Sequence, residues 1–521
     1  MKITIQHQNI STTTEYRQPV KLSTVITENG ISFDMPCGGK GRCGKCKVQA
    51  VGELSPLTEK ERETLTPEEL AAGVRLACVT DAMGDCTVIL PEKKKMDGIV
   101  STGCLPAFQP DPGEGYGMAV DIGTTTVVVY LYDLQNGSLV GQACARNPQS
   151  AFGADVISRI EKSLAGEGER LAEAIRTCID QLLNEICEKH QIKREQVARG
   201  VITGNTAMLY LLMNHPTDSI ATAPFEMDEV YGRWMPAQEV GIELEKDAQI
   251  YLTRCIAAFV GGDITSAILA CDICDKPENS LMVDIGTNGE MALKVGEKLL
   301  CCSTAAGPAF EGAGIYMGMN GVDGAVSKVW LENGKLAWEV IGGGAATGIC
   351  GSGIIDAVAT LLEMGVIDET GVLDEENETW GHLFTEVEDS VAFRLGDSGV
   401  VITQQDIRAI QLAKSAICAG METLIRHCEL NADQLDHLYI AGGFGSFLNV
   451  RNAERIGLIP GGFADKSIVV GNAAGMGATA QLLSSQLLHR SEEIARQARN
   501  VELSTDPYFM DRYVDGMMFE A

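Results

Sequence analysis

Four cysteines near the N-terminus have the spacing of an iron–sulfur site. Cys37, Cys43 and Cys46 lie in MPCGGKGRCGKCKV as a C-x5-C-x2-C run, and Cys78 follows in RLACVTD. Three closely spaced thiolates with one distant thiolate are the arrangement that binds a [2Fe–2S] cluster. The glycines between them allow the loop to fold around such a cluster and to point backbone N–H groups at its sulfurs. The spacing therefore predicts a one-electron redox centre held by these four cysteines.

Two other kinds of site could use the same loop. A zinc site usually has two short-spaced cysteine pairs, whereas this loop holds one C-x2-C pair. Residues 39–45 read G-x4-G-K, but a P-loop continues with Ser or Thr, and Cys46 follows here. Cys86 could replace one of the four ligands, although a buried thiol explains it more simply. The [2Fe–2S] cluster is the interpretation that fits the spacing best.

The segments around this loop have the patterns of a small β-rich domain. MKITIQ reads as a strand, and a helix is expected at residues 22–28. After the loop come a strand in CKVQAV, a helical stretch at 58–69 and a strand at 87–90. Together with the cysteine spacing, this order resembles the plant-type and adrenodoxin-type ferredoxins, which have a β-grasp fold. The resemblance covers residues 1–92, and the five-residue first interval is that of the adrenodoxin group.

A second feature that could carry chemistry is an internal repeat. GMAVDIGTTTVVVYLYDLQNGSLV begins at Gly117, and LMVDIGTNGEMALKVGEKLL begins at Leu281. Each reads as a strand, a glycine turn after an aspartate, a second strand, a hairpin turn and a third strand. The pair resembles the actin, sugar-kinase and Hsp70 ATPases, in which two Asp-Gly hairpins face each other across a cleft. In those proteins the hairpins hold the nucleotide phosphates and Mg²⁺.

The residue types in both turns suit that role. Glycine at Gly123 and Gly286 permits a tight turn whose N–H groups point at phosphate oxygens. Asp121 and Asp284 could hold Mg²⁺, mostly through its water molecules, since Mg²⁺ loses water reluctantly. The resemblance implies that one of the two, and Asp284 rather than Asp121, orients the attacking water. Hydroxyl and amide donors follow the glycines directly: Thr124, Thr125, Thr126, Thr287 and Asn288.

A glycine-rich turn late in the sequence is the expected adenosine site. HLYIAGGFGSFLNV runs from an apolar strand into Gly442, Gly443 and Ser446. The absence of glycine side chains allows the backbone to lie against a flat base and its ribose. A plain turn between a strand and a helix is the alternative. VITGNTAM, with Asn205, and GICGSGIID are further strand–helix corners whose helix N-termini could bind anions or could be ordinary turns.

Composition and charge limit the partners. The chain has 521 residues, enough for roughly two to four domains, and its formal net charge is −30. A surface this acidic repels phosphates, so we expect no nucleic-acid partner. No apolar run reaches the ~20 residues of a membrane span, and the N-terminus lacks the apolar core of a signal peptide. We therefore expect a cytoplasmic protein that does not enter a membrane.

The cysteines beyond the four proposed ligands show little clustering. Cys271 and Cys274 in CDIC, and the adjacent Cys301 and Cys302, are neighbours in sequence. A second cluster would need four ligands brought together by the fold. We expect these cysteines to be small buried hydrophobic residues, and Cys104 to have no ligand role.

These patterns predict the domain organisation. Residues 1–92 are a ferredoxin domain, 93–116 a linker, 117–278 the first half of an ATPase and 279–521 its second half. The predicted fold class is α+β and α/β, with a β-grasp domain followed by a two-lobed, actin-like ATPase built on a ribonuclease H-like repeat. The Pro- and Gly-rich linker reads as a hinge or tether, long enough for the ferredoxin domain to dock in more than one place.

The fusion of these two modules limits the function further. A ferredoxin that carries electrons downhill has no use for an ATPase, and a metabolite kinase has no use for a one-electron centre. We infer that nucleotide turnover drives or gates electron transfer. Nearly the whole chain resembles the ATP-dependent reductive activators of corrinoid proteins, through CGGKGRCGKC, AVDIGTTT, NPQSAFGADVISRI, GVITGNTAM, VDIGTNGE, AAGPAFEGAGIYMGM, GICGSGIID and IAGGFGSFLN.

This resemblance implies a reaction, site residues and partners. Members of the family return cob(II)amide centres to methyl-transfer cycles by reducing Co(II) to Co(I). The four cysteines would hold the cluster, and Asp121, Thr124, Asp284, Thr287 and Gly443 would surround ATP and Mg²⁺. The implied partners are a corrinoid protein of a methyltransferase system, an upstream electron donor and a second copy in a homodimer. Larger members carry an extra module between ferredoxin and ATPase, where this chain has only the linker.

Other functions remain open at this point. An ATP-dependent activator of another low-potential metalloenzyme, such as a dehydratase, would use the same parts. Such activators usually share a [4Fe–4S] cluster between subunits, however, and no matching cysteine pair stands out. A redox sensor could bind ATP without turnover. A small-molecule kinase would leave the ferredoxin domain unexplained.

Overall fold

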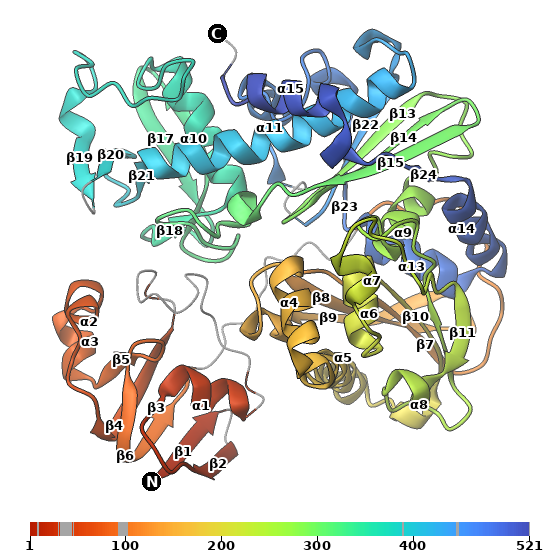
Figure 1. The fold of residues 1–521 in the computed structure, drawn as a ribbon, viewed down its shortest axis with the longest axis horizontal. Coiled ribbons are helices and arrows are strands. Elements are labelled where there is room, and N and C mark those ends of the chain that lie inside the picture. Colours follow the sequence, from red (N-terminus) through yellow and green to blue (C-terminus); the bar gives the residue numbers. More distant parts are fainter. Residues whose placement is uncertain are drawn as a thin grey trace. The chain divides into compact units, whose positions relative to one another are not determined.

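The computed structural model describes residues 1–7, 10–29, 31, 44, 46–91, 103–387, 390–443 and 447–519. These residues divide into two compact units (Figure 1). Met1–Met96 with Pro148–Lys162 form the N-terminal unit, and Asp97–Asn147 with Ser163–Ala521 form the C-terminal unit. Three of the residues assigned from sequence to the cluster or the nucleotide, Cys37, Cys43 and Ser446, lie outside the described residues.

A mixed sheet forms the core of the N-terminal unit. Its strands lie in the order β2-β1-β6-β4-β5, with β3 paired to β6. The first and last strands along the chain, β1 and β6, are neighbours in the sheet and run parallel. Helix α1 (Leu22–Glu28) buries Leu22, Val25 and Ile26 in the same core as Ile3. This arrangement confirms the predicted β-grasp fold and the predicted helix. The strand bounds are β1 Lys2–His7, β2 Ile10–Glu15, β3 Val20–Lys21, β4 Lys47–Leu54, β5 Val74–Leu76 and β6 Asp81–Ile89.

The helical stretch expected at residues 58–69 is broken. Helix α2 is Glu59–Thr64 and helix α3 is Pro67–Ala71. The proline that begins α3 disfavours helical backbone in the residue before it, which is Thr66. The Thr66 hydroxyl then caps α3 by accepting a hydrogen bond from Glu69 N at 3.2 Å. Helix α4 (Val156–Lys162) also belongs to the N-terminal unit.

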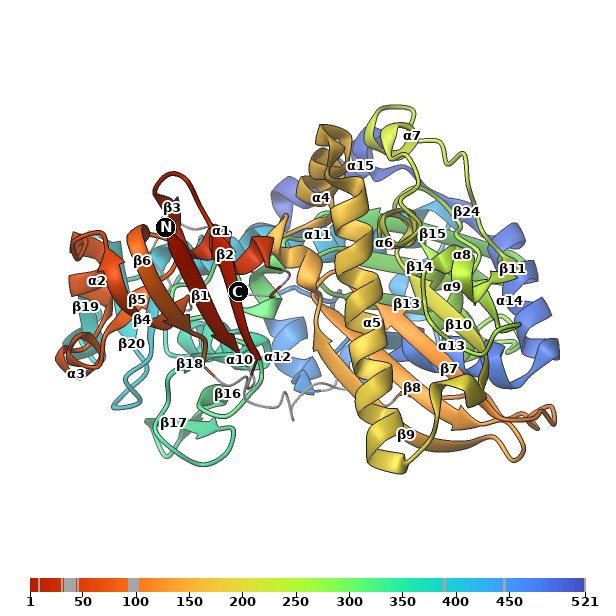
Figure 2. The same ribbon diagram turned by 90° about the horizontal axis from the view of Figure 1, so that it is seen from below.

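Two sheets in the described part of the C-terminal unit share a five-strand order (Figures 1 and 2), and each has a sixth strand at a different edge, β11 beside β12 and β24 beside β15. The first is β11-β12-β10-β7-β8-β9 and the second is β23-β22-β13-β14-β15-β24. In each, an antiparallel three-strand meander is extended by two parallel strands, β10 and β12 in the first and β22 and β23 in the second. The internal repeat and the two-lobed, actin-like fold class are therefore confirmed.

The strands of the first sheet are β7 Tyr116–Ile122, β8 Thr126–Asp133, β9 Ser138–Arg146, β10 Val197–Gly204, β11 Arg233–Pro236 and β12 Gln249–Leu252. Those of the second are β13 Ser280–Ile285, β14 Gly289–Val295, β15 Lys298–Thr304, β22 His437–Ala441, β23 Ser467–Gly471 and β24 Arg499–Asn500. Smaller sheets in the second half contain β16 Ala325–Glu332, β17 Lys335–Val340 and β18 Gly348–Ile349, and β19 Phe384–Val387, β20 Ser390–Arg394 and β21 Val401–Thr403.

Helices cover these sheets and join the two halves. Helix α5 packs on β8 and β9, and α11 packs on β13, β14 and β15 with α15 against it (Figures 1 and 2). Helices α9 and α13 pack against each other and contact strands of both sheets. The helix bounds are α5 Gly168–His190, α6 Thr206–Leu212, α7 Asp218–Ala221, α8 Ala237–Val240, α9 Gly262–Cys271, α10 Gly351–Glu363, α11 Gln404–His427, α12 Val450–Arg455, α13 Ala473–Leu483, α14 Ser485–Gln497 and α15 Pro507–Asp515.

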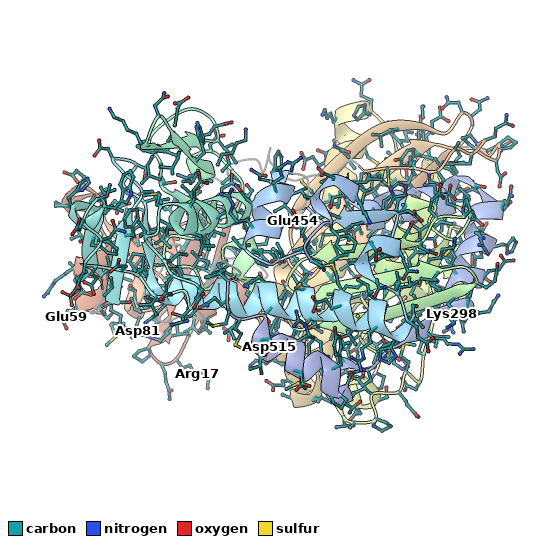
Figure 3. All side chains as sticks on the ribbon, turned by 90° about the horizontal axis from the view of Figure 1, so that it is seen from above. Arg17, Glu59, Asp81, Lys298, Glu454 and Asp515 are labelled. Atoms are coloured by element: carbon teal, nitrogen blue, oxygen red, sulfur yellow. The ribbon has the colours of Figure 1, made fainter. Side chains whose placement is uncertain are left out.

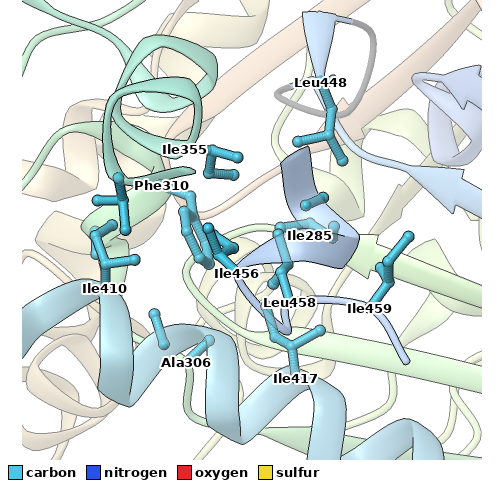
Figure 4. Packing of buried hydrophobic residues seen from close by; sticks show 14 of the residues in the cluster. Ile285, Ala306, Phe310, Ile355, Ile410, Ile417, Leu448, Ile456, Leu458 and Ile459 are labelled. Atoms are coloured by element: carbon cyan, nitrogen blue, oxygen red, sulfur yellow. The ribbon is translucent and has the colours of Figure 1, made fainter. Parts of the chain in front are cut away.

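Alternate residues of β13 face two different cores. Leu281, Val283 and Ile285 belong to the core shared with α11, which Figure 4 shows around Ile285 and Phe310. Met282 belongs to the core that α9 and α13 form between the sheets. This two-residue alternation is expected of a strand buried on both sides. It holds the end of β13, and the turn that follows, between two rigid layers.

Residues 103–115 run along the C-terminal unit. Cys104 N donates to Val470 O at 3.2 Å, and Asp111 N donates to Leu483 O at 2.7 Å. The Cys104 side chain is half-buried beside α9. This part of the predicted linker is therefore a packed segment, in contrast to the tether expected from its Pro and Gly content.

Charged side chains cover the surface of both units. Arg17, Glu59, Lys298 and Asp515 are exposed examples (Figure 3). Helices long and apolar enough to cross a bilayer are absent from the part of the chain that the structure describes.

Candidate active site

The first hairpin turn joins β7 to β8 directly after Asp121 and Ile122. Gly123 N donates to Thr126 O at 2.9 Å, and a Cβ at Gly123 would lie 2.8 Å from the same carbonyl oxygen. Any larger residue would therefore open the turn. Asn147, which is fully buried, donates from Nδ2 to Gly123 O at 2.8 Å and from its backbone N to Thr125 O at 2.8 Å. These bonds fix the shape of the turn.

The second hairpin turn joins β13 to β14. Gly286 N donates to Asn288 O at 3.1 Å, and Gly307 N donates to Thr287 O at 2.9 Å. A Cβ at Gly286 would meet its nearest neighbours at 3.5 and 3.7 Å, which is ordinary contact. The steric requirement for glycine that the sequence suggested at both turns is thus found at Gly123 and not at Gly286.

Four carboxyl groups interact next to these turns. Asp121 and Asp284 lie at the ends of β7 and β13, one residue before each strand ends. Glu290 lies directly opposite Asp284 on β14, and Asp263 lies in the first turn of α9. The charges of Asp121 and Asp284 both act on Asp263, and all three aspartates act on Glu290. The repeat and α9 therefore bring carboxylates from both halves of the chain to one place.

Burial and like charge raise the pKa of these acids. Burial raises the pKa of Asp121 to about 6. Burial, with the charges of Asp121 and Glu311, raises the pKa of Asp284 to about 7. Burial, with the charges of Asp284 and Asp121, raises the pKa of Asp263 to about 8. Burial, with the charges of all three aspartates, holds the pKa of Glu290 well above its ordinary value. Such a set holds protons at neutral pH unless a cation replaces them.

The arrangement fits a hydrated divalent cation. Glu290 is 8% exposed, and its Oε1 atom has no hydrogen-bond partner among the described residues. The three aspartates are half-buried, so water can reach them. Within the described ranges, no three His, Cys, Asp or Glu side chains are placed to enclose a bare metal ion. Mg²⁺ suits such a site because it keeps much of its water and is held by a few carboxylates.

Two asparagines support the site from helix starts. Asn472 caps α13, hydrogen-bonds the Asp121 carboxyl and donates from Nδ2 to Tyr130 OH at 3.2 Å. Asn205 caps α6 and donates from Nδ2 to Thr124 Oγ1 at 3.2 Å. The VITGNTAM corner is therefore part of the site, where it orients a side chain of the first turn.

One carboxylate connects the two turns. Glu311 ends a short 3₁₀ turn (Pro308–Glu311) in the second half of the chain. Its Oε1 atom accepts a hydrogen bond from Thr287 Oγ1 at 2.9 Å, and its Oε2 atom accepts one from Thr125 Oγ1. The hydroxyls of both turns therefore point toward the same place, as a shared phosphate chain would require.

The glycine turn predicted for adenosine lies beside the second hairpin. Gly442 has a φ of +97°, and a Cβ there would lie 2.7 Å from Ile285 O and 2.8 Å from Asp284 Oδ1. Gly443 is exposed, and a Cβ there would meet nothing within 4 Å. Gly442 is thus needed for close packing against Asp284, whereas Gly443 borders open space.

Cys46 and Cys78 are the predicted cluster ligands that the structure describes. Both are buried, and their Sγ atoms lie 3.2 Å apart. A disulfide would bring the sulfurs to about 2.05 Å, so Cys46 and Cys78 are not joined to each other by one. Ala77 N donates to Cys46 O at 2.9 Å, which ties the two cysteine segments together. Two thiols that face each other in this way fit two ligands of one iron–sulfur cluster.

Glu61 fixes the segment that carries Cys78. Its side chain is fully buried, and Oε1 accepts hydrogen bonds from Arg75 Nε at 2.7 Å, Leu76 N at 3.1 Å and Thr80 Oγ1 at 2.8 Å. These donors lie on both sides of Cys78. Burial alone would raise the pKa of Glu61, but the Arg75 guanidinium and the other donors lower it to about 2. The carboxylate is therefore charged and holds the Cys78 segment in place.

Three further residues of the site were not predicted from the sequence: Asp263, Glu290 and Glu311. Glu290 could have been predicted from the hairpin pattern, because a residue directly opposite Asp284 in a hairpin lies on the same face of the sheet. Asp263 follows two glycines at the start of α9, which is a weaker indication. Glu311 lies in AAGPAFEGAGIYMGM, yet nothing local marks its carboxylate, because its partners lie on two distant hairpins.

Known families and proteins match this chain along its whole length. Residues 5–83 match the 2Fe-2S iron-sulfur cluster binding domain, residues 116–276 the RACo middle region, and residues 278–521 the C-terminal domain of RACo, the ASKHA domain. The corrinoid activation enzyme RamQ of Eubacterium limosum is 32% identical over 96% of both chains. The [Co(II) methylated amine-specific corrinoid protein] reductase of Methanosarcina barkeri is 27% identical over 77% of this chain and 76% of its own.

A solved structure has the same fold from end to end. The reductive activator for corrinoid, iron-sulfur protein is 30% identical to this chain, with a TM-score of 0.72, and the match covers 99% of this chain and 98% of that one. The match therefore spans both the ferredoxin segment and the two repeats of this chain. This chain belongs to the RACo family of ATP-dependent reductive activators of corrinoid proteins.

Proposed function

We propose that this protein uses ATP to reduce the cobalt of a partner corrinoid protein from Co(II) to Co(I) in a methyltransferase system. The observation that carries the proposal is that two hairpin turns, each preceded by an aspartate at the end of a strand, share one set of interacting carboxyls. The same chain carries an iron–sulfur domain at residues 5–83. The names of its relatives describe activation of corrinoid proteins, which supports this choice of acceptor.

The nucleotide would be held by both hairpins. Asp121 and Asp284 would hold Mg²⁺ through its water molecules, with Asp263 and Glu290 behind them, and Asp284 would also orient the attacking water. The backbone N–H, hydroxyl and amide donors for the phosphate oxygens would come from Gly123, Thr124, Thr125, Gly286, Thr287 and Asn288. The turn containing Gly442, Gly443 and Ser446 would lie along the adenosine.

The iron–sulfur cluster would be held by Cys37, Cys43, Cys46 and Cys78. When bound, the cluster supplies one electron, so that it is oxidised as Co(II) becomes Co(I). Each ~59 mV of unfavourable potential is a tenfold change in equilibrium, and an uphill step of roughly 300 mV therefore costs about 7 kcal/mol. ATP hydrolysis can supply this if the nucleotide state changes how the corrinoid protein docks or how its cobalt is coordinated.

An upstream reductant would restore the electron, and two copies would form a homodimer. Reduced thiols and an oxygen-sensitive electron carrier suit the cytoplasm. We retain residues 1–92 as the ferredoxin domain, 93–116 as the linker, and 117–278 and 279–521 as the two halves of the ATPase.

The corrinoid dependence of ATP hydrolysis tests this proposal. We expect the reduced protein to hydrolyse MgATP faster when a cob(II)amide-loaded corrinoid protein of a methyltransferase system is added. Asp284→Asn should abolish hydrolysis, whereas Cys46→Ser, which removes a cluster ligand, should leave hydrolysis intact but prevent cobalt reduction. Hydrolysis without any cobalt reduction in the wild-type protein would point to another low-potential acceptor.

A further inference from the structure

Glu311 is held rigidly by the core of the second half. Phe310, the residue before it, is 1% exposed and lies in the same cluster as Ile285 (Figure 4). Gly312, the residue after it, has a φ of +77° and donates from N to Ala309 O at 3.0 Å. A Cβ at Gly312 would lie 2.6 Å from Met319 N, so the turn packs closely against the backbone of Met319. The Glu311 carboxylate is therefore presented from a fixed backbone.

This carboxylate joins the two halves of the ATPase through side chains alone. Thr287 belongs to the second hairpin, which lies in the same half as Glu311, but Thr125 belongs to the first hairpin. A threonine hydroxyl has one proton to donate. While both hydroxyls donate to Glu311, neither can donate to a phosphate oxygen. A phosphate that took the place of Glu311 at these hydroxyls would also be repelled by the nearby carboxylate, since both groups are negatively charged.

We propose that Glu311 is a positioning residue that occupies the Thr125 and Thr287 hydroxyls in the nucleotide-free protein and yields them to the phosphates of the nucleotide. The inference rests on the proposed function, since it assumes that the hairpins bind nucleotide. Nucleotide binding then breaks the hydrogen bond between Thr125 and Glu311 that links the two halves, and release of the nucleotide restores it. Glu311 therefore opposes nucleotide binding and promotes product release.

Nucleotide affinity and turnover distinguish this role from a structural one. Glu311→Ala removes the competing carboxylate, so we expect the Kd for MgADP to fall at least about tenfold. We expect KM for MgATP and kcat to fall together, because product release becomes slow. Glu311→Gln keeps the shape and one acceptor oxygen, and its Kd should lie between those of the wild type and Glu311→Ala. A side chain that only supported the fold would give the opposite sign, weaker binding.

Isothermal titration of MgADP into the full chain, with thermal unfolding of each variant, provides the test. Glu339→Gln is the matched control, because Glu339 lies in the same half and pairs with Lys328 on the surface; its Kd should equal that of the wild type. If Glu311→Ala does not fold, Glu311→Gln carries the test. Equal or weaker MgADP binding by a folded Glu311 variant would overturn the inference. Absence of MgADP binding by the wild type would instead refute the proposed nucleotide site.

Discussion

Asp121, Asp284, Asp263 and Glu290 all have raised pKa values because they are buried close to one another's charges. An aspartate in an unfolded chain ionises near pH 4, whereas the pKa values of Asp121, Asp284 and Asp263 are raised to about 6, 7 and 8 by burial and mutual repulsion. Between pH 4 and these raised pKa values, the folded protein holds protons that the unfolded chain has lost. The contribution of these carboxyl groups to stability is complete below pH 4 and is lost as the pH rises to 8.

A bound divalent cation should offset the loss of stability that occurs as the pH rises. We predict that, in EDTA, the Tm of the C-terminal unit falls between pH 6 and pH 8, and that Mg²⁺ raises the Tm more at pH 8 than at pH 6. Asp284→Asn should reduce both effects, since it removes one titrating carboxyl. Thermal scans at several pH values, with EDTA or Mg²⁺, provide the measurement. A stabilisation by Mg²⁺ that did not depend on pH would argue against the carboxyl set as its site.

Glu61 shows the opposite linkage in the N-terminal unit. Its pKa is lowered from 4.5 to about 2 by Arg75 and the surrounding donors, against the effect of burial. Its contribution to stability is therefore present above pH 4.5 and is lost as the pH falls toward 2. Because the same carboxylate accepts hydrogen bonds from residues on both sides of Cys78, loss of its charge should also weaken binding of the cluster.

A pair of glutamates allows a matched test of this residue. Glu61 and Glu69 both occupy the third position of a capping box, but Glu69 is partly exposed and pairs with Lys47. We predict that Glu61→Gln lowers the free energy of unfolding by ~3–5 kcal/mol, as expected for breaking a buried ion pair. Glu69→Gln should cost less than about 1 kcal/mol. Urea titration followed by the visible absorbance of the cluster would measure both, and equal losses would contradict the account.

At the scale of elements, the presence of the strands and hairpins was predictable from the sequence, whereas the residues at which helices and strands begin and end were less so. The repeated Asp-Gly pattern located both hairpins, because a strand–turn–strand signal is local. The helix expected at 58–69 is two helices, since Pro67 and the Thr66 cap restart it. The strand expected at 87–90 extends back to Asp81, because pairing with β4 recruits residues that lack a strong strand pattern of their own.

The site itself was only partly predictable. Sequence spacing indicated Asp121 and Asp284, which the fold brings into interaction. Glu311 could not be found in this way, because its role depends on two threonines in separate hairpins. The packed course of residues 103–115 was also hidden, since Pro and Gly content does not reveal backbone bonds to distant strands.

Two adjacent glycines provide a test at the scale of an element. A Cβ at Gly442 would collide with Ile285 O and Asp284 Oδ1 in a positive-φ conformation, whereas one at Gly443 would face open space. We predict that Gly442→Ala destabilises the C-terminal unit by ~1–3 kcal/mol and abolishes ATP hydrolysis. Gly443→Ala should leave the Tm unchanged and weaken MgADP binding, because the added methyl would meet the adenosine. Unchanged affinity in Gly443→Ala would place the adenosine elsewhere.

At the scale of the whole molecule, the chain combines two units with different physical tasks. The N-terminal unit buries Cys46 and Cys78, two of the predicted cluster ligands, and the charged network around Glu61 holds the segment that carries Cys78. The C-terminal unit duplicates one sheet topology, so that two hairpins place carboxyls and hydroxyls side by side. A formal net charge of −30 gives the whole surface a strong preference for partners with basic patches. Association with a corrinoid protein should therefore slow as ionic strength rises.

The most direct test is an anaerobic spectrum of the partner's cobalt. The reduced protein is mixed with a cob(II)amide-loaded corrinoid protein, and the visible spectrum is recorded with and without MgATP, for the wild type and for Asp284→Asn. We predict that cob(I)amide forms only with the wild type and MgATP. Equal formation of cob(I)amide without MgATP, or with Asp284→Asn, would contradict the claim that nucleotide turnover at the paired hairpins drives the electron transfer.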